Sequence, residues 1–150
     1  MKCPFCNSES HRVIDKRKGQ GGNSIRRRRE CLECGRRFTT YERLEIGNIM
    51  VVKKDGTRAP FDREKILKGI VKAVEKRPVT ADEVNDMVDA IETAIRVKYD
   101  REVESSEIGN LVIEELRRVD KVAYIRFASV YKDFKDVETF EQEIKKLLKQ

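Results

Sequence analysis

Cys3-Pro4-Phe5-Cys6 and Cys31-Leu32-Glu33-Cys34 contain all four cysteines of this 150-residue chain, and 24 residues separate the two pairs. A Cys-x-x-Cys turn lets two thiolates converge on one metal ion, so two such turns complete a closed tetrahedral site. Redox or disulfide chemistry is the alternative, but a redox pair of this kind needs a strand-helix-strand context, whereas the intervening sequence is polar and arginine-rich. The spacing therefore predicts one structural zinc ion per chain, bound by Cys3, Cys6, Cys31 and Cys34.

This ligand set also bears on catalysis. Four protein ligands leave no coordination position open for a substrate, so catalysis at the metal is not expected. The only histidine, His11, is surplus to a four-sulfur site and is expected at the surface or in a contact.

Composition places the chain among globular proteins. Hydrophobic residues make up 39% of it and charged residues 40%, and no apolar run approaches the ~18 residues that a membrane-spanning helix needs. The metal motif begins at Cys3, which leaves no room for a signal peptide before it. We therefore expect a cytoplasmic protein without a membrane segment, in a compartment where thiols stay reduced.

The net charge of +6 is unevenly distributed. Residues 1–45 carry 12 Lys and Arg against 6 Asp and Glu, whereas residues 46–150 carry 21 of each. A small basic module beside a neutral remainder is typical of a nucleic-acid-binding unit joined to a unit with another task.

Three short strands are predicted between and after the cysteine pairs, over 11–15, 24–29 and 36–41, with a glycine-rich turn at 18–23. Side chains alternate along a strand, so Arg26 and Arg28 face one way while Arg27 and Arg29 face the other. The alternative to nucleic-acid contact is a solvated charge run beside the acidic metal centre. Further cations widen the basic surface: Arg12, Lys16, Arg17, Lys18, Arg36 and Arg37.

The second part of the chain reads as a hairpin followed by helices. Asp55-Gly56 lies between two apolar segments and predicts a β-hairpin over 49–61. Helical periodicity then predicts a helix from Asp62 to Pro78 and others that begin near Thr80, Ser105 or Ser106, and Asp120. A final amphipathic stretch, 137–150, can pack on its own core or on another subunit. The predicted fold class is α+β: a small N-terminal β zinc ribbon, then a mainly helical domain with a β-hairpin lid.

Lysines in the hairpin and the first helix suggest an anion site. A hairpin folded over the helix N-terminus would place Lys53, Lys54 and Lys65 near unpaired backbone amides, where phosphates are favoured. Ordinary surface lysines are the alternative. Neither a P-loop nor a dinucleotide-binding glycine motif is present.

Four segments of the chain, 3–6, 24–31, 36–42 and 123–131, read CPFC, SIRRRREC, RRFTTYE and AYIRFASVY. Together they resemble the NrdR family of bacterial transcriptional repressors of ribonucleotide reductase operons, and the likeness covers essentially the whole chain. The resemblance implies a zinc ribbon joined to an ATP-cone, the nucleotide-sensing module that ribonucleotide reductases also carry. This chain differs from the residues that are common in the family at three positions: Lys16, Lys54 and Ala59.

The resemblance also implies roles for individual residues. Arg17, Arg26 and Arg28 are implied to contact double-stranded DNA, and Arg12 joins them as part of the basic surface. The residues implied to bind ATP or dATP are Val51, Lys53, Lys54, Lys65 and Tyr131. The domains expected are a DNA-binding zinc ribbon over 1–45, an ATP-cone over 49–139 and an amphipathic helix over 140–150.

The sequence is thus interpreted as a repressor that ATP and dATP control through its oligomeric state, and not as an enzyme. Two alternatives remain: a zinc-ribbon nucleic-acid-binding protein without nucleotide control, and an ATP-cone accessory fragment of a reductase. A reductase itself needs a large catalytic domain with redox cysteines, whereas all four cysteines here are assigned to zinc.

Overall fold

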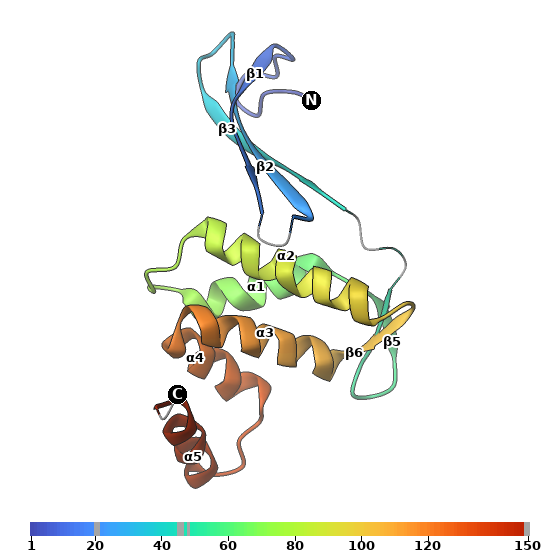
Figure 1. The fold of residues 1–150 in the computed structure, drawn as a ribbon, viewed down its shortest axis with the longest axis vertical. Helices are drawn as coiled ribbons and strands as arrows, with labels where there is room; N and C mark the ends of the chain where they lie inside the picture. Colours follow the sequence, from blue (N-terminus) through green and yellow to red (C-terminus); the bar gives the residue numbers. More distant parts are fainter. Residues whose placement is uncertain (20–21, 45–46, 48, 149–150) are drawn as a thin grey trace. The chain divides into compact units, whose positions relative to one another are not determined.

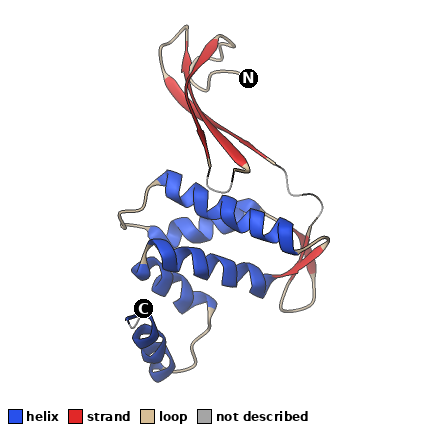
Figure 2. Ribbon diagram, in the orientation of Figure 1, coloured by secondary structure: helices blue, strands red, loops and turns tan. Residues whose placement is uncertain are grey.

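The computed structural model describes residues 1–19, 22–44, 47 and 49–148 (Figure 1). The chain divides into two compact units, Met1–Glu45 and Ile46–Gln150. The first consists of strands and turns, and the second combines helices with a small sheet (Figure 2).

The first unit is an antiparallel sheet in the order β1-β2-β3, formed by β1 (His11–Lys18), β2 (Ser24–Cys31) and β3 (Arg37–Arg43). The three predicted strands are present, and β1 runs three residues past the predicted end. Among its described residues, only Cys3, Ser24 and Cys31 are buried. So small a core cannot hold a sheet by apolar burial, which assigns that task to the cysteine cluster.

β1 contains a β-bulge that the sequence did not reveal. Val13 pairs with Arg29, but Asp15 pairs with Arg28, so the register shifts by one residue at Ile14. Because strand side chains alternate, one extra residue changes which side chains share a face on either side of it.

The small sheet of the second unit has the order β5-β4-β6. It comprises β4 (Met50–Val52), β5 (Arg58–Pro60) and β6 (Glu102–Glu104), with β4 and β5 antiparallel as the hairpin predicted. The third strand, β6, was not predicted. It pairs in parallel with β4, buries Val103 and brings Glu102 within 2.6 Å of the Arg58 guanidinium.

The helices enclose the core of the second unit. They are α1 (Arg63–Val74), α2 (Ala81–Lys98), α3 (Ser105–Val119), α4 (Lys121–Tyr131) and α5 (Val137–Leu148). Asp62 caps α1, and Thr80 and Glu83 form a capping box at the start of α2, where a helix was predicted to begin. The largest fully buried helical side chains are Ile70, Val88, Ile91, Ile95 and Leu116. No helix within the described residues is long and apolar enough to span a membrane.

The first helix ends earlier than predicted. It stops at Val74, and Glu75 is already extended, so Pro78 follows the end of the helix by several residues. Arg126 of α4 provides the physical reason, because its guanidinium donates to the backbone carbonyls of Ala73 and Glu75 at the end of α1. A tertiary contact therefore satisfies these terminal carbonyls, which proline cannot do because it has no backbone N–H.

The last helix packs on α4 of its own chain. Leu147 is buried, the Lys132 ammonium lies 2.7 Å from a Glu143 carboxylate oxygen, and the Tyr124 hydroxyl donates to the same oxygen. Glu143 therefore holds α5 to two side chains of α4. The helix begins at Val137, and positions 149–150 of the predicted stretch lie outside the described residues.

Candidate functional site

The four cysteine sulfurs converge at one end of the ribbon. All lie within 4.8 Å of one another, with 3.7 Å between the sulfurs of Cys3 and Cys34 and 3.6 Å between those of Cys6 and Cys31. A tetrahedron with Zn–S bonds of about 2.3 Å has sulfurs about 3.8 Å apart. The cluster therefore fits a structural zinc ion. His11 lies outside it, with its ring nitrogen 3.1 Å from the carbonyl of Met1.

Two equivalent turns build this cluster. In each, the residue four positions after the first cysteine donates its amide to that cysteine's carbonyl, over 2.9 Å from Asn7 and 3.0 Å from Gly35. Both residues have positive φ, 61° and 68°, which glycine and asparagine adopt more readily than other residues. The Cys-x-x-Cys sequence and the residue after it thus suffice to form each turn.

The turn also favours the thiolate form of Cys31. Hydrogen bonding from the Cys34 backbone, opposed by burial and helped by the Glu33 backbone and neighbouring thiols, lowers the pKa of Cys31 to about 6. The thiolate is the form in which cysteine binds a metal ion.

The bulge at Ile14 gathers the predicted DNA-binding arginines on one face of the ribbon. Directly opposed residues of an antiparallel pair project to the same side, and the opposed pairs include Arg12 with Glu30 and Arg17 with Arg26. Arg28 shares this side with Arg26, because the two are two residues apart in β2. Without the bulge, Arg12 and Arg17 would lie on opposite faces, since their positions differ by five, an odd number. We call this side the arginine face; it also contains Arg37, Tyr41 and Arg43 of β3.

Two carboxylates organise the arginine face. Glu30 lies 2.8 Å from Arg12 and 3.1 Å from Arg37, and hydrogen bonds from Arg12 and then Arg37 hold its pKa below the usual range. Asp15 lies 3.1 Å from Arg17 and 3.8 Å from Arg26. The guanidiniums are therefore held in place while much of their charge stays available to a polyanion.

The opposite face of β2 is occupied differently. Arg27 forms an ion pair with Glu42, and the Arg29 side chain donates to the Thr40 hydroxyl over 3.0 Å. The two faces of β2 therefore differ in their partners: carboxylates of β1 and β2 on the arginine face, and side chains of β3 on the other face.

The predicted nucleotide-binding residues surround two separate pockets of the second unit. The first, the lysine pocket, has a volume of about 230 Å³ between the hairpin, the start of α1 and the start of α3. Its lining includes Val51, Lys53, Ala59, Asp62, Lys65 and Ser105. Two ammonium groups at the capped end of α1 make it suited to phosphates.

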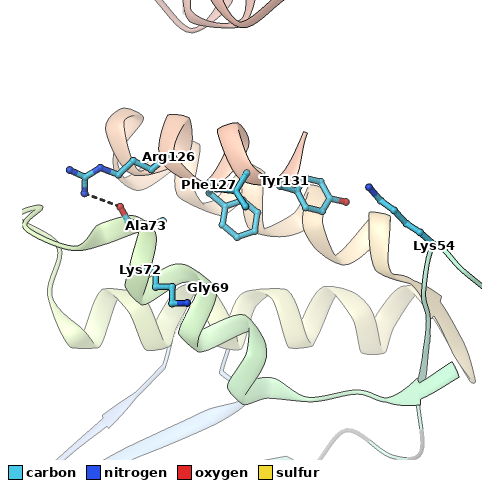
Figure 3. Close-up of a pocket in the computed structure, with 8 residues that line it drawn as sticks. Lys54, Gly69, Lys72, Ala73, Arg126, Phe127 and Tyr131 are labelled. Carbon is cyan, nitrogen blue, oxygen red and sulfur yellow. Dashed lines mark hydrogen bonds between the residues drawn. The ribbon is translucent and has the colours of Figure 1, made fainter. Parts of the chain in front are cut away.

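The second, the aromatic pocket, has a volume of about 510 Å³ and lies between α1, α4 and the hairpin turn. Figure 3 shows Phe127 and Tyr131 projecting from α4, with Lys54 beyond the hydroxyl end of Tyr131 and Lys72 on α1. The two rings are stacked, with centroids 5.7 Å apart and an interplanar angle of 23°. An aromatic wall with cations at its rim can receive a purine base and its phosphates.

The structure thus divides the predicted set. Val51, Lys53 and Lys65 share the lysine pocket, whereas Lys54 and Tyr131 share the aromatic pocket. Lys54 lies in the turn that follows β4, which places it at the other pocket from Lys53 and Lys65.

Six lining residues of the aromatic pocket were not predicted as site residues, and three of them have charged or aromatic side chains: Lys72, Arg126 and Phe127. Arg126 and Phe127 fall inside the aromatic motif at 123–131, and Phe127 precedes Tyr131 by one helical turn. That i, i+4 spacing is the signal that could have identified it. Lys72 has no distinguishing signal in the sequence.

Comparisons with known proteins match both units. Residues 1–42 match the family described as "Transcriptional repressor NrdR-like, N-terminal domain", and residues 49–137 match the ATP cone domain. Similar curated proteins bear the name Transcriptional repressor NrdR. The one from Fervidobacterium nodosum is 56% identical over 98% of this chain and 96% of its own length. The one from Petrotoga mobilis is 54% identical over 98% of each chain.

A four-sulfur zinc ribbon joined to an ATP-cone defines a class of nucleotide-responsive regulators rather than a class of enzymes. Within that class the chain belongs to the NrdR family. A Thermoanaerobacter pseudethanolicus protein named Transcriptional repressor NrdR is 54% identical over the whole of this chain and 95% of its own length.

Proposed function

We propose that this chain is a zinc-dependent transcriptional repressor that binds operator DNA of ribonucleotide reductase genes and responds to ATP and dATP. The observation that carries the proposal is that one chain combines a metal-held arginine face with a helical unit containing cationic pockets. Residues 1–45 are assigned to DNA, residues 49–139 to the nucleotide, and residues 140–150 to a C-terminal helix that supports α4.

The DNA assignment rests on Arg12, Arg17, Arg26 and Arg28. Guanidinium groups can bind phosphates and guanine edges in a two-pronged manner, and their spacing over neighbouring strands suits a groove lined by phosphates. Zinc has no catalytic part in this function; it holds the sheet that presents the arginines.

The nucleotide assignment rests on Lys53 and Lys65 in the lysine pocket and on Lys54 and Tyr131 in the aromatic pocket. Ammonium groups bind phosphates, while the tyrosine ring offers a base a flat apolar surface. Burial, then the nearby Glu107 carboxylate, raises the pKa of Tyr131, so its hydroxyl stays a hydrogen-bond donor at neutral pH. Val51 supplies apolar surface beside the lysines.

Control through oligomeric state completes the proposal. If ATP and dATP favour different homo-oligomers, each nucleotide selects how many ribbons reach a paired DNA site, and binding of DNA and nucleotide become linked. A cytoplasmic location belongs to the same proposal, because it keeps the four thiols reduced for zinc.

The experiment measures binding of ATP and dATP to the zinc-loaded chain by calorimetry, its particle size by light scattering and its operator affinity. We expect Lys53→Ala or Lys65→Ala to weaken binding of both nucleotides at least tenfold, since a charged hydrogen bond contributes about 1.5 to 3 kcal/mol. Zinc content should stay intact.

The control is Lys68→Ala, which removes an exposed lysine of α1 outside both pockets. It should bind both nucleotides as the wild type does. Equal particle size and equal operator affinity with ATP and dATP in the wild type would instead favour a zinc-ribbon protein without nucleotide control.

A further inference from the structure

Gly109 lies in the interior of α3 directly beneath the ring of Tyr131. A Cβ atom built on Gly109 would lie closer than 3.0 Å to the ring carbon Cζ and to the hydroxyl oxygen of Tyr131, and real Cβ atoms essentially never approach so closely. The three nearest atoms all belong to the Tyr131 side chain, and none belongs to a backbone. The missing side chain therefore accommodates a ring and not a close crossing of two helices.

The ring is fixed to α3 at a second point. The Tyr131 hydroxyl donates to the backbone carbonyl of Ser106 over 2.7 Å, one turn before Gly109. The ring thus contacts α3, and it also lines the aromatic pocket, where it stacks with Phe127. Two χ angles alone would not hold a side chain at the last residue of α4 in this orientation.

The residue that follows Tyr131 is held to α5 and to the end of α4. The next residue, Lys132, is paired with Glu143 of α5, and its amide caps α4 by donating to Ala128. A methyl group at position 109 would therefore be relieved by rotation of the ring rather than by displacement of α4. Rotation would move the ring out of its stacked position in the aromatic pocket.

We propose that Gly109 is a positioning residue for nucleotide binding: its lack of a side chain seats the Tyr131 ring at the height at which it can support a base in the aromatic pocket. The inference rests on the proposed nucleotide function of that pocket. Glycine otherwise destabilises a helix interior relative to alanine, so its presence here is offset by the fit of the ring.

A double-mutant cycle tests this positioning role of Gly109 in the full zinc-loaded chain. It uses Gly109→Ala, Tyr131→Ala and the double variant. Calorimetry with dATP should show that Gly109→Ala weakens binding at least tenfold, about 1.4 kcal/mol. The double variant should bind no more weakly than Tyr131→Ala alone, because without the ring the methyl group has nothing to displace.

Thermal unfolding followed by the helical circular dichroism signal gives an independent measurement. Gly109→Ala should lower the midpoint by about 4 °C or more in the presence of the ring, and should leave it unchanged or raise it in the Tyr131→Ala background. Gly69→Ala is the matched stability control, because its Cβ would lie 3.4 Å from Phe127, an ordinary contact. It should not lower the midpoint.

Unchanged dATP affinity in Gly109→Ala would refute the proposed positioning role of Gly109 while leaving the proposed function intact. The same holds if the losses of dATP affinity from the two single substitutions add in the double variant. Absence of nucleotide binding by the wild type would instead refute the proposed function. If Gly109→Ala fails to fold, recovery of a folded double variant supports the positioning role, and failure of both overturns it.

Discussion

Asp120 shows how a single carboxylate can join two parts of the helical unit. It caps α4 by accepting the Ala123 amide over 2.8 Å, and it receives the Arg77 guanidinium at 3.0 Å from the segment between α1 and α2. The hydrogen bond from Arg77 comes first among the causes that hold its pKa below the usual range. The residue therefore acts as a cap and as half of an ion pair.

The first prediction concerns the two roles of Asp120. Asp120→Ala removes both and should lower the free energy of unfolding by about 2 kcal/mol or more. Asp62→Ala removes only an exposed cap of α1 and should lower it by about 1 kcal/mol. Urea unfolding followed by helical circular dichroism measures both, and equal losses would mean that the Arg77 pair contributes nothing.

The contribution of Asp120 to folding stability depends on pH with a definite sign. Because the pKa of Asp120 is lower in the folded state, its stabilisation is fully present above the unfolded value near 3.9 and is lost as pH falls through the folded value. Asp120→Asn keeps a capping side chain without the charge, so its stability should fall less steeply between about pH 5 and pH 3. The same slope in variant and wild type would contradict this assignment.

At the scale of the element, one extra residue in β1 decides which of its side chains lie on the arginine face. Every side chain on the N-terminal side of Ile14 lies on the opposite face from where a regular strand would place it relative to the rest of β1. The bulge therefore selects which cations of β1 join Arg26 and Arg28, and it selects Arg12 and Arg17 rather than Lys16 and Lys18.

The second prediction compares two double substitutions, one of the two arginines and one of the two lysines. Each removes two positive charges from exposed positions of β1. Arg12→Ala with Arg17→Ala should weaken operator binding at least tenfold and reduce the salt slope by about 0.9 for each phosphate that is no longer bound. Lys16→Ala with Lys18→Ala should change affinity about threefold or less, as expected for a diffuse charge effect. Binding isotherms across a salt series test the difference, and equal effects of the two double variants would reject a single DNA-facing side.

At the scale of the whole molecule, the two units depend on different sources of stability. The ribbon buries only three described side chains and relies on metal, whereas the second unit buries a continuous apolar cluster drawn from all five helices and the small sheet. Binding of a structural zinc supplies on the order of 10 kcal/mol, which no rearrangement of so small a sheet can replace.

The third prediction follows from this difference. Cys31→Ser leaves three sulfur ligands, so the ribbon should lose zinc and operator binding, while the helical unit should keep its thermal midpoint within about 2 °C. Metal analysis, operator binding and helical circular dichroism measure the three quantities. Normal operator binding by a zinc-free variant would show that metal does not hold the arginine face, and Ser8→Ala, which changes a nearby hydroxyl but no ligand, is the control.

The sequence by itself determined the features that depend on short spacings: both cysteine turns, the zinc ligands, the hairpin at Asp55-Gly56, and the starts of α1, α2 and α4. Each is fixed by residues no more than a few positions apart, so local hydrogen bonding and side-chain type suffice to predict it. The resemblance carried by longer motifs added the family and the candidate binding residues.

Only the tertiary structure decided which of those residues meet. The bulge placed Arg12 and Arg17 on one face, β6 joined β4 across some fifty residues of sequence, and the hairpin sent Lys53 and Lys54 to different pockets. The proposed role of Gly109 depends on the Tyr131 ring, which belongs to another helix. The physical reason is that strand register, packing and the seating of a ring depend on partners distant in sequence, which spacing along the chain does not encode.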